Sequence, residues 1–74
     1  RGSERIGIEV ETGRSDAVEN VRAGLSDGLN QVIVVATDDT ALAKVEQQLR
    51  AAGLLGHRRV TLRLHERLSL SGRL

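Results

Sequence analysis

Residues 32–36 read VIVVA, and this run of consecutive apolar side chains constrains the fold more than any other feature of the sequence. Most of its residues are β-branched. Such a run is typical of a strand that is buried on both faces at the centre of a parallel sheet. We therefore predict a central strand over residues 32–36.

Two further segments alternate between apolar and polar residues, with the period of two that is typical of a strand with two different faces. The first is residues 6–11, whose apolar positions are Ile6, Ile8 and Val10. The second is residues 60–65, whose apolar positions are Val60, Leu62 and Leu64. Because the second segment is polar on one side, we expect it at an edge of the sheet.

Helical patterns fill the two gaps between these strands. Asp16 and Glu19 have the spacing of a capping box, and the dipeptide Asp27-Gly28 fits a helix end. The stripe of this first helix is Val18, Val21 and Leu25. The second helix has N-cap residue types at positions 37–39, ends at Gly53, and carries the stripe Leu42, Val45, Leu49 and Ala52.

Strands that are separated by helices of this length form right-handed crossovers, with a helix over the sheet after each strand. The predicted fold class is therefore α/β, with a three-stranded parallel sheet in the order β-α-β-α-β. We expect residues 1–66 to form a single small domain. The pattern predicts nothing for residues 67–74, which we treat as a C-terminal tail.

The composition predicts a thin core. The 74 residues include no Phe, Trp, Tyr or Met, so the core must consist of Val, Ile, Leu and Ala. Such a core gives marginal stability unless another polypeptide covers one face. We therefore expect a homo-oligomer or a fragment of a larger protein, and the lack of a Met at position 1 favours the fragment.

The charge balance excludes a broad nucleic-acid surface, because the formal net charge is only +1. Five arginines cluster near the C-terminus and could contact phosphates, although a solvated edge strand explains them better: Arg58, Arg59, Arg63, Arg67 and Arg73. The chain has no cysteine. No apolar run approaches the roughly 18 residues of a membrane span, so we expect no membrane contact and, by default, a cytoplasmic location.

Glu9 and Glu11 are the most informative candidate residues. Two positions apart on a strand, they project from the same face with roots about 7 Å apart, and they could converge on a hard cation such as Mg²⁺. Gly7 lies on the same face and leaves room for a ligand to approach. The alternative, which the spacing alone makes equally acceptable, is a sheet face that is simply exposed to water.

The turn from residue 11 to residue 16 leads from a strand end to a helix start, where backbone N–H groups and Arg14 could bind an anion. A purely structural turn is the alternative. Asp38 and Asp39 follow the central strand at the same edge, and helix capping explains them sufficiently. His57 and His65 are isolated, and we interpret them as surface residues.

The stretch IGIEVETGRSD, residues 6–16, followed by a helix and by VVAT at 34–37, resembles the PD-(D/E)xK superfamily of restriction-endonuclease-like domains. The form it resembles occurs in uncharacterised bacterial and archaeal proteins that are tied to ATPases of mobile elements. The resemblance covers roughly residues 6 to 52. It implies that this chain is the second half of such a domain.

The resemblance implies that Glu9 binds Mg²⁺, that Glu11 stands at the usual lysine position, and that Arg14 contacts a phosphate of DNA. Glu-x-Glu variants of the motif occur among restriction enzymes. The strand that carries the aspartate of the Pro-Asp motif is not in this sequence, so hydrolysis by this chain alone is not expected. A weaker resemblance, to toprim domains, would use Glu11, Asp38 and Asp39.

Two hypotheses follow from the sequence. In the first, the chain is the metal-binding half of a nuclease domain that acts on DNA, with Glu9 and Glu11 as metal ligands and Arg14 as a phosphate contact. In the second, it is a non-catalytic α/β module that mediates assembly through an uncovered sheet face.

Overall fold

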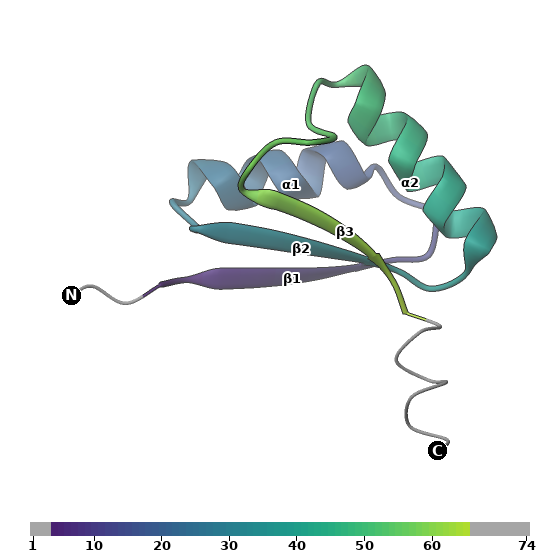
Figure 1. Ribbon diagram of the computed structural model, residues 1–74, viewed down its shortest axis with the longest axis horizontal. Helices are drawn as coiled ribbons and strands as arrows, with labels where there is room; N and C mark the ends of the chain where they lie inside the picture. The colour runs from purple at the N-terminus through teal and green to yellow at the C-terminus, as the bar shows by residue number, and fades with distance from the viewer. Residues whose placement is uncertain (1–3, 66–74) are drawn as a thin grey trace, which may run out of the picture.

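The computed structural model describes residues 4–65 of the chain, in which three strands and two helices alternate (Figure 1). The elements are β1 (Ile6–Glu11), α1 (Ala17–Ser26), β2 (Gln31–Ala36), α2 (Asp39–Ala51) and β3 (Val60–Leu64). The predicted fold class and element order are confirmed. The tail at 67–74, like Glu66, lies outside the described residues.

The three strands form one sheet in the order β1-β2-β3, and both neighbouring pairs are parallel. Val34 at the middle of β2 aligns with Glu9 on one side and with Leu62 on the other. The predictions that residues 32–36 are central and that β3 is an edge strand are therefore correct.

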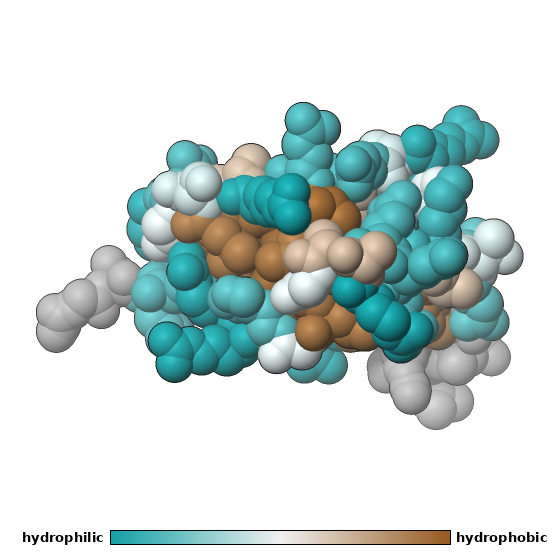
Figure 2. Space-filling view, turned by 90° about the horizontal axis from the view of Figure 1, so that it is seen from above, coloured by the Kyte–Doolittle hydropathy of each residue, from teal (hydrophilic) through white to brown (hydrophobic). Residues whose placement is uncertain are grey.

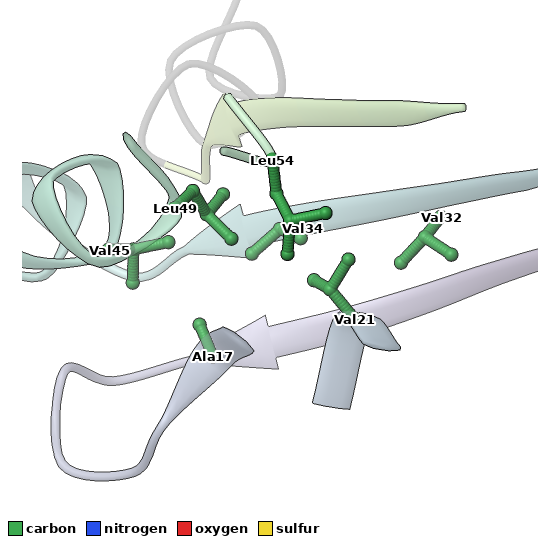
Figure 3. Packing of buried hydrophobic residues seen from close by; sticks show 7 residues of the cluster. All are labelled: Ala17, Val21, Val32, Val34, Val45, Leu49 and Leu54. Atoms are coloured by element: carbon green, nitrogen blue, oxygen red, sulfur yellow. The ribbon is translucent and has the colours of Figure 1, made fainter. Parts of the chain in front are cut away.

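Both helices cover the same face of the sheet (Figure 1). Each strand lies beside the strand that precedes it in the sequence, so both connections run across the sheet in the same direction. Two crossovers of the same hand then place both helices on one face of the sheet. Side chains from α1, α2 and β2 converge there, together with one from the α2–β3 connection (Figure 3). The buried cluster is Ala17, Val21, Val32, Val34, Val45, Leu49 and Leu54.

The opposite face of the sheet carries no helix among residues 4–65. On β2, Val32 and Val34 are fully buried beneath the helices, whereas Ile33 points to the open side and is only half-buried. The prediction that the central strand is buried on both faces is therefore wrong for Ile33. The reason is that two crossovers of one hand leave the second face uncovered.

The helix ends follow the residue types expected from the sequence. The Oδ1 atom of Asp16 accepts a hydrogen bond from the Val18 N–H at 3.0 Å, and Asp38 Oδ1 accepts one from the Ala41 N–H at 2.8 Å. Helix α2 ends before Gly53, whose φ of 75° is easily adopted only by glycine. The chain then returns to the core.

The side chain of Arg59, which precedes β3, forms hydrogen bonds to the C-terminal end of α1 and to the connection that follows it. Its Nη2 atom donates to the Leu29 carbonyl at 2.6 Å and to the Leu25 carbonyl at 3.2 Å, and its Nε atom also reaches Leu29 at 3.2 Å. A cation near helix C-terminal carbonyls is favourable because it opposes the negative end of the helix dipole. This arginine therefore joins the first crossover to the last strand.

Figure 2 looks down on Figure 1 from above and shows apolar surface in the middle of the molecule, bordered by hydrophilic side chains. Several apolar residues that pack on the buried cluster are only partly buried, among them Leu55, Val60 and Leu62. The core is therefore as thin as the composition predicts. None of the helices in residues 4–65 has the length and apolar character required to span a bilayer.

Leu49 is one of the largest fully buried side chains, so we expect Leu49→Ala to lower the free energy of unfolding by about 2–5 kcal/mol. This loss is comparable to the ~3–5 kcal/mol that a core of this size supplies. Urea titration followed by far-UV circular dichroism measures it, because the chain has no aromatic residue to report on folding. The control Gln47→Ala replaces an exposed residue of the same helix, and it should change the free energy of unfolding by no more than about 0.5 kcal/mol. Equal losses in both variants would contradict the assigned core.

Candidate functional site at the carboxyl edge of the sheet

The carboxyl ends of β1 and β2 bring the candidate residues to one edge of the sheet. Glu11, the last residue of β1, aligns with Ala36, the last residue of β2. Its carbonyl accepts a hydrogen bond from the Thr37 N–H at 3.1 Å, and Asp38 follows directly. Open parallel α/β sheets place their ligands at this edge.

Glu9 and Glu11 project from the same face of β1, as predicted, and this face is the one that the helices cover. They align with Val34 and Ala36, which are both fully buried. Glu9 is half-buried and Glu11 is 1% exposed. The interpretation of this face as simply exposed to water is therefore wrong for Glu11.

The Glu11 carboxylate is only half satisfied. Its Oε2 atom accepts a hydrogen bond from Asn20 Nδ2 at 2.9 Å, whereas its Oε1 atom is buried without a hydrogen-bond partner. A buried acceptor without a partner costs about 1–3 kcal/mol, and more if it is charged. The ion pair found among residues 4–65 joins Arg50 to Glu46, so no arginine of this part of the chain compensates Glu11.

Two carboxylates are fewer than a complete metal centre requires. Within residues 4–65, no group of three or more His, Cys, Asp or Glu side chains is placed to hold a metal ion. Mg²⁺ takes six oxygen ligands, several of which are commonly water. Glu9 and Glu11 could therefore supply part of a coordination shell, with the remainder from solvent or from residues outside this part of the chain.

The space beside Gly7 is occupied. A Cβ atom at this position would lie 2.5 Å from Leu29 Cδ1, so the Leu29 side chain fills the room that the missing side chain leaves. The expectation that Gly7 makes way for a ligand is therefore wrong. Close packing of the α1–β2 connection against β1 explains the glycine.

The connection between β1 and α1 packs against the beginning of α2. Gly13 has a φ of 90°, and a Cβ atom there would lie 3.3 Å from the Cα atom of Ala41. Arg14 follows with an exposed side chain. Its predicted contact with a phosphate remains a prediction.

The N-terminus of α1 has few backbone donors left for an anion. The Ala17 N–H donates to Gln48 Oε1 at 3.3 Å, and the Val18 N–H is capped by Asp16. Side chains thus occupy two of the four N–H groups that a helix leaves free at its start. This favours the structural interpretation of the turn over an anion site at the helix end.

The remaining candidates have local roles. Asp38 caps α2, as expected, and Asp39 is exposed in its first turn. His57 is half-buried and its Nδ1 atom accepts a hydrogen bond from the Arg59 N–H at 3.0 Å, so it is less exposed than predicted. His65 is exposed, which agrees with its interpretation as a surface residue.

Sequence analysis missed two features of this region. Asn20 is the hydrogen-bond partner of Glu11, and its position next to the buried Val21 on the inner side of α1 was the available indication. The second feature is which residues lie on the uncovered face that the assembly hypothesis assumed: it is the apolar side of β1, with Ile6, Ile8 and Val10 exposed. The strand order with two like-handed crossovers could have indicated it.

Comparison of the chain with known protein families, with curated proteins and with solved structures finds no match. Within residues 4–65, the fold and the site define an α/β domain with a parallel sheet, one sheet face without a helix and two inward-facing glutamates.

The role of Asp38 can be tested by substitution. As an N-cap, Asp38→Ala should lower the free energy of unfolding by about 1 kcal/mol, whereas Asp38→Asn should lose much less because its amide oxygen can accept the same bond. Thermal unfolding with and without Mg²⁺ provides the measurement. Asp39→Ala is the matched control and should cost only a few tenths of a kcal/mol. A loss at Asp38 that appears only when Mg²⁺ is present would contradict a purely structural role.

Proposed function

We propose that this domain is an assembly module, and that another polypeptide covers its open sheet face in the working protein. The observation that carries the proposal is the exposure of the apolar side of β1, where Ile6 is 52%, Ile8 64% and Val10 62% exposed. These three side chains stand in a row on the face that lacks helices.

The row continues onto the central strand. Ile8 aligns with the half-buried Ile33, and Val10 aligns with Val35, which is only 9% exposed, so the exposed side chains of β1 border apolar side chains of β2. A single exposed apolar residue is normal, but a contiguous patch marks a site of contact. Parallel sheets are almost always covered on both faces. Full burial of one such side chain contributes about 1.5–3 kcal/mol, which favours a covered face.

An apolar probe should bind this face selectively. We expect the dye 8-anilinonaphthalene-1-sulfonate to shift the methyl NMR resonances of Ile8, Ile33 and Val10, and to leave those of Val45 and Leu49 unchanged, because the latter are buried beneath the helices. The double variant Ile8→Thr with Val10→Thr should lose most of the response.

The threonine variant keeps β-branched side chains at exposed positions, so its unfolding free energy should change by less than about 1 kcal/mol. A cooperative urea transition in both proteins verifies that the dye reports on the native state. Shifts spread evenly over all methyl groups, or no shift at all, would remove the support for the proposal.

A second candidate function has a specific observation in its favour. The unpartnered Oε1 atom of Glu11, together with Glu9 on the same face, supports a divalent-cation site. On this hypothesis, and in line with the resemblance to PD-(D/E)xK domains, the chain is the incomplete, metal-binding half of a nuclease-like domain that acts on DNA. Glu9 and Glu11 would hold Mg²⁺ and Arg14 would contact a phosphate.

Divalent cations should then stabilise the native chain. We expect Mg²⁺ or Mn²⁺ to raise its melting temperature, because a ligand that binds only the folded state adds to the free energy of unfolding. The rise should disappear in the double variant Glu9→Ala with Glu11→Ala. Circular dichroism during heating, with EDTA as the metal-free reference, gives both values.

The double variant Glu4→Ala with Glu19→Ala removes two carboxylates from exposed positions and is the matched control. It should retain the response to metal. If neither the native chain nor this control responds to Mg²⁺ or Mn²⁺, the cation hypothesis fails.

A further inference from the structure

We infer that the occupant of the open sheet face is an amphipathic helix with an acidic flank, supplied from outside these 74 residues. The inference rests on the proposed assembly function and specifies its partner. Three properties of the face carry it: its apolar pattern, its dimensions and the sign of its charge.

The face changes from apolar to polar across the three strands. β1 contributes the exposed Ile6, Ile8 and Val10, and β2 contributes the half-buried Gln31 and Ile33 and the edge of Val35, which is 9% exposed. On β3 the same side presents Thr61 and Arg63, because these align with Ile33 and Val35. One half of the face therefore offers apolar contact, and the other half offers polar groups.

The dimensions of the face suit a helix. Strands lie about 4.8 Å apart, so the outer two strands are roughly 10 Å apart, which is close to the diameter of one helix with its side chains. β1 has six residues and is about 20 Å long. About 13 residues of a helix, rising 1.5 Å each, would cover that length.

The charge of the face has one sign. Arg63 on β3 is exposed and supplies this charge. No acidic side chain stands on this side of the three described strands. A helix that lays its apolar stripe over β1 and β2 would bring one flank to Arg63, and an aspartate or glutamate there would pair with the guanidinium.

A second copy of the chain is a poorer occupant. It would present the same face, so it would add a second Arg63 without any carboxylate to compensate either arginine. Residues 66–74 are also poorly matched, because their sequence contains two arginines and one glutamate. Both alternatives are outcomes of the experiment.

The test uses two synthetic helical peptides of about 18 residues with the same apolar stripe, which includes one tryptophan. One peptide carries glutamate along the flank and the other carries lysine. Because the protein contains no aromatic residue, the tryptophan emission comes from the peptide alone. We expect saturable binding with a blue shift, and an affinity up to about fivefold higher for the glutamate peptide, as one exposed charge pair allows.

Protein variants separate local pairing from overall charge. Arg63→Glu should reverse the preference between the peptides, and Arg63→Gln should abolish it. Arg22→Glu makes the same charge change at an exposed position of α1, on the other side of the sheet, and should leave the preference intact. The double variant Ile8→Thr with Val10→Thr should lower the affinity for both peptides by at least about fivefold.

Several results would overturn the inference. Equal affinities for the two peptides, or an effect of Arg22→Glu as large as that of Arg63→Glu, would exclude charge recognition at Arg63. A dimer in sedimentation that the glutamate peptide does not dissociate would identify a second copy as the occupant. Binding only after removal of residues 66–74 would identify the tail. Loss of both peptide binding and dye binding would instead reject the proposed function itself.

Discussion

The inward orientation of Gly7, Glu9 and Glu11 is the constraint on which the rest of the structure depends. Leu29 occupies the space above Gly7, and a larger residue there would require the Leu29 side chain to shift. This close contact is consistent with the side of β1 that faces the helices. Because strand side chains alternate, a slip of one position would exchange the two faces completely. In this register the glutamates are covered and the isoleucines are open.

This orientation leaves one group on each face of the sheet without a full set of contacts. On the covered side, the Glu11 carboxylate has one hydrogen bond and one unpartnered oxygen. On the open side, the apolar side chains of β1 face solvent. Each feature lowers the stability of a chain whose core is built from small aliphatic residues. Their coexistence favours a domain whose native environment includes another polypeptide, and for this reason we rank assembly above catalysis.

Local sequence patterns predicted the elements and their ends well. The alternation of 6–11, the apolar run at 32–36 and the caps at Asp16 and Asp38 each depend on neighbours in the sequence, so they could be recognised there. That Glu9 and Glu11 project from the same face follows from the two-residue period of a strand. Which face is covered does not follow from that period, because it depends on how the two helices pack over the sheet. The Asn20 contact depends in the same way on how α1 lies over β1.

The position of Arg59 in the sequence affects when its hydrogen bonds can form during synthesis. Its guanidinium donates hydrogen bonds to carbonyls at and just after the end of α1, although Arg59 follows both helices in the sequence. During vectorial synthesis, β1, α1 and β2 leave the ribosome before the residue that fastens the α1–β2 connection. The hydrogen bonds from Arg59 to the end of α1 and to the α1–β2 connection can therefore form only after the start of the last strand has been synthesised.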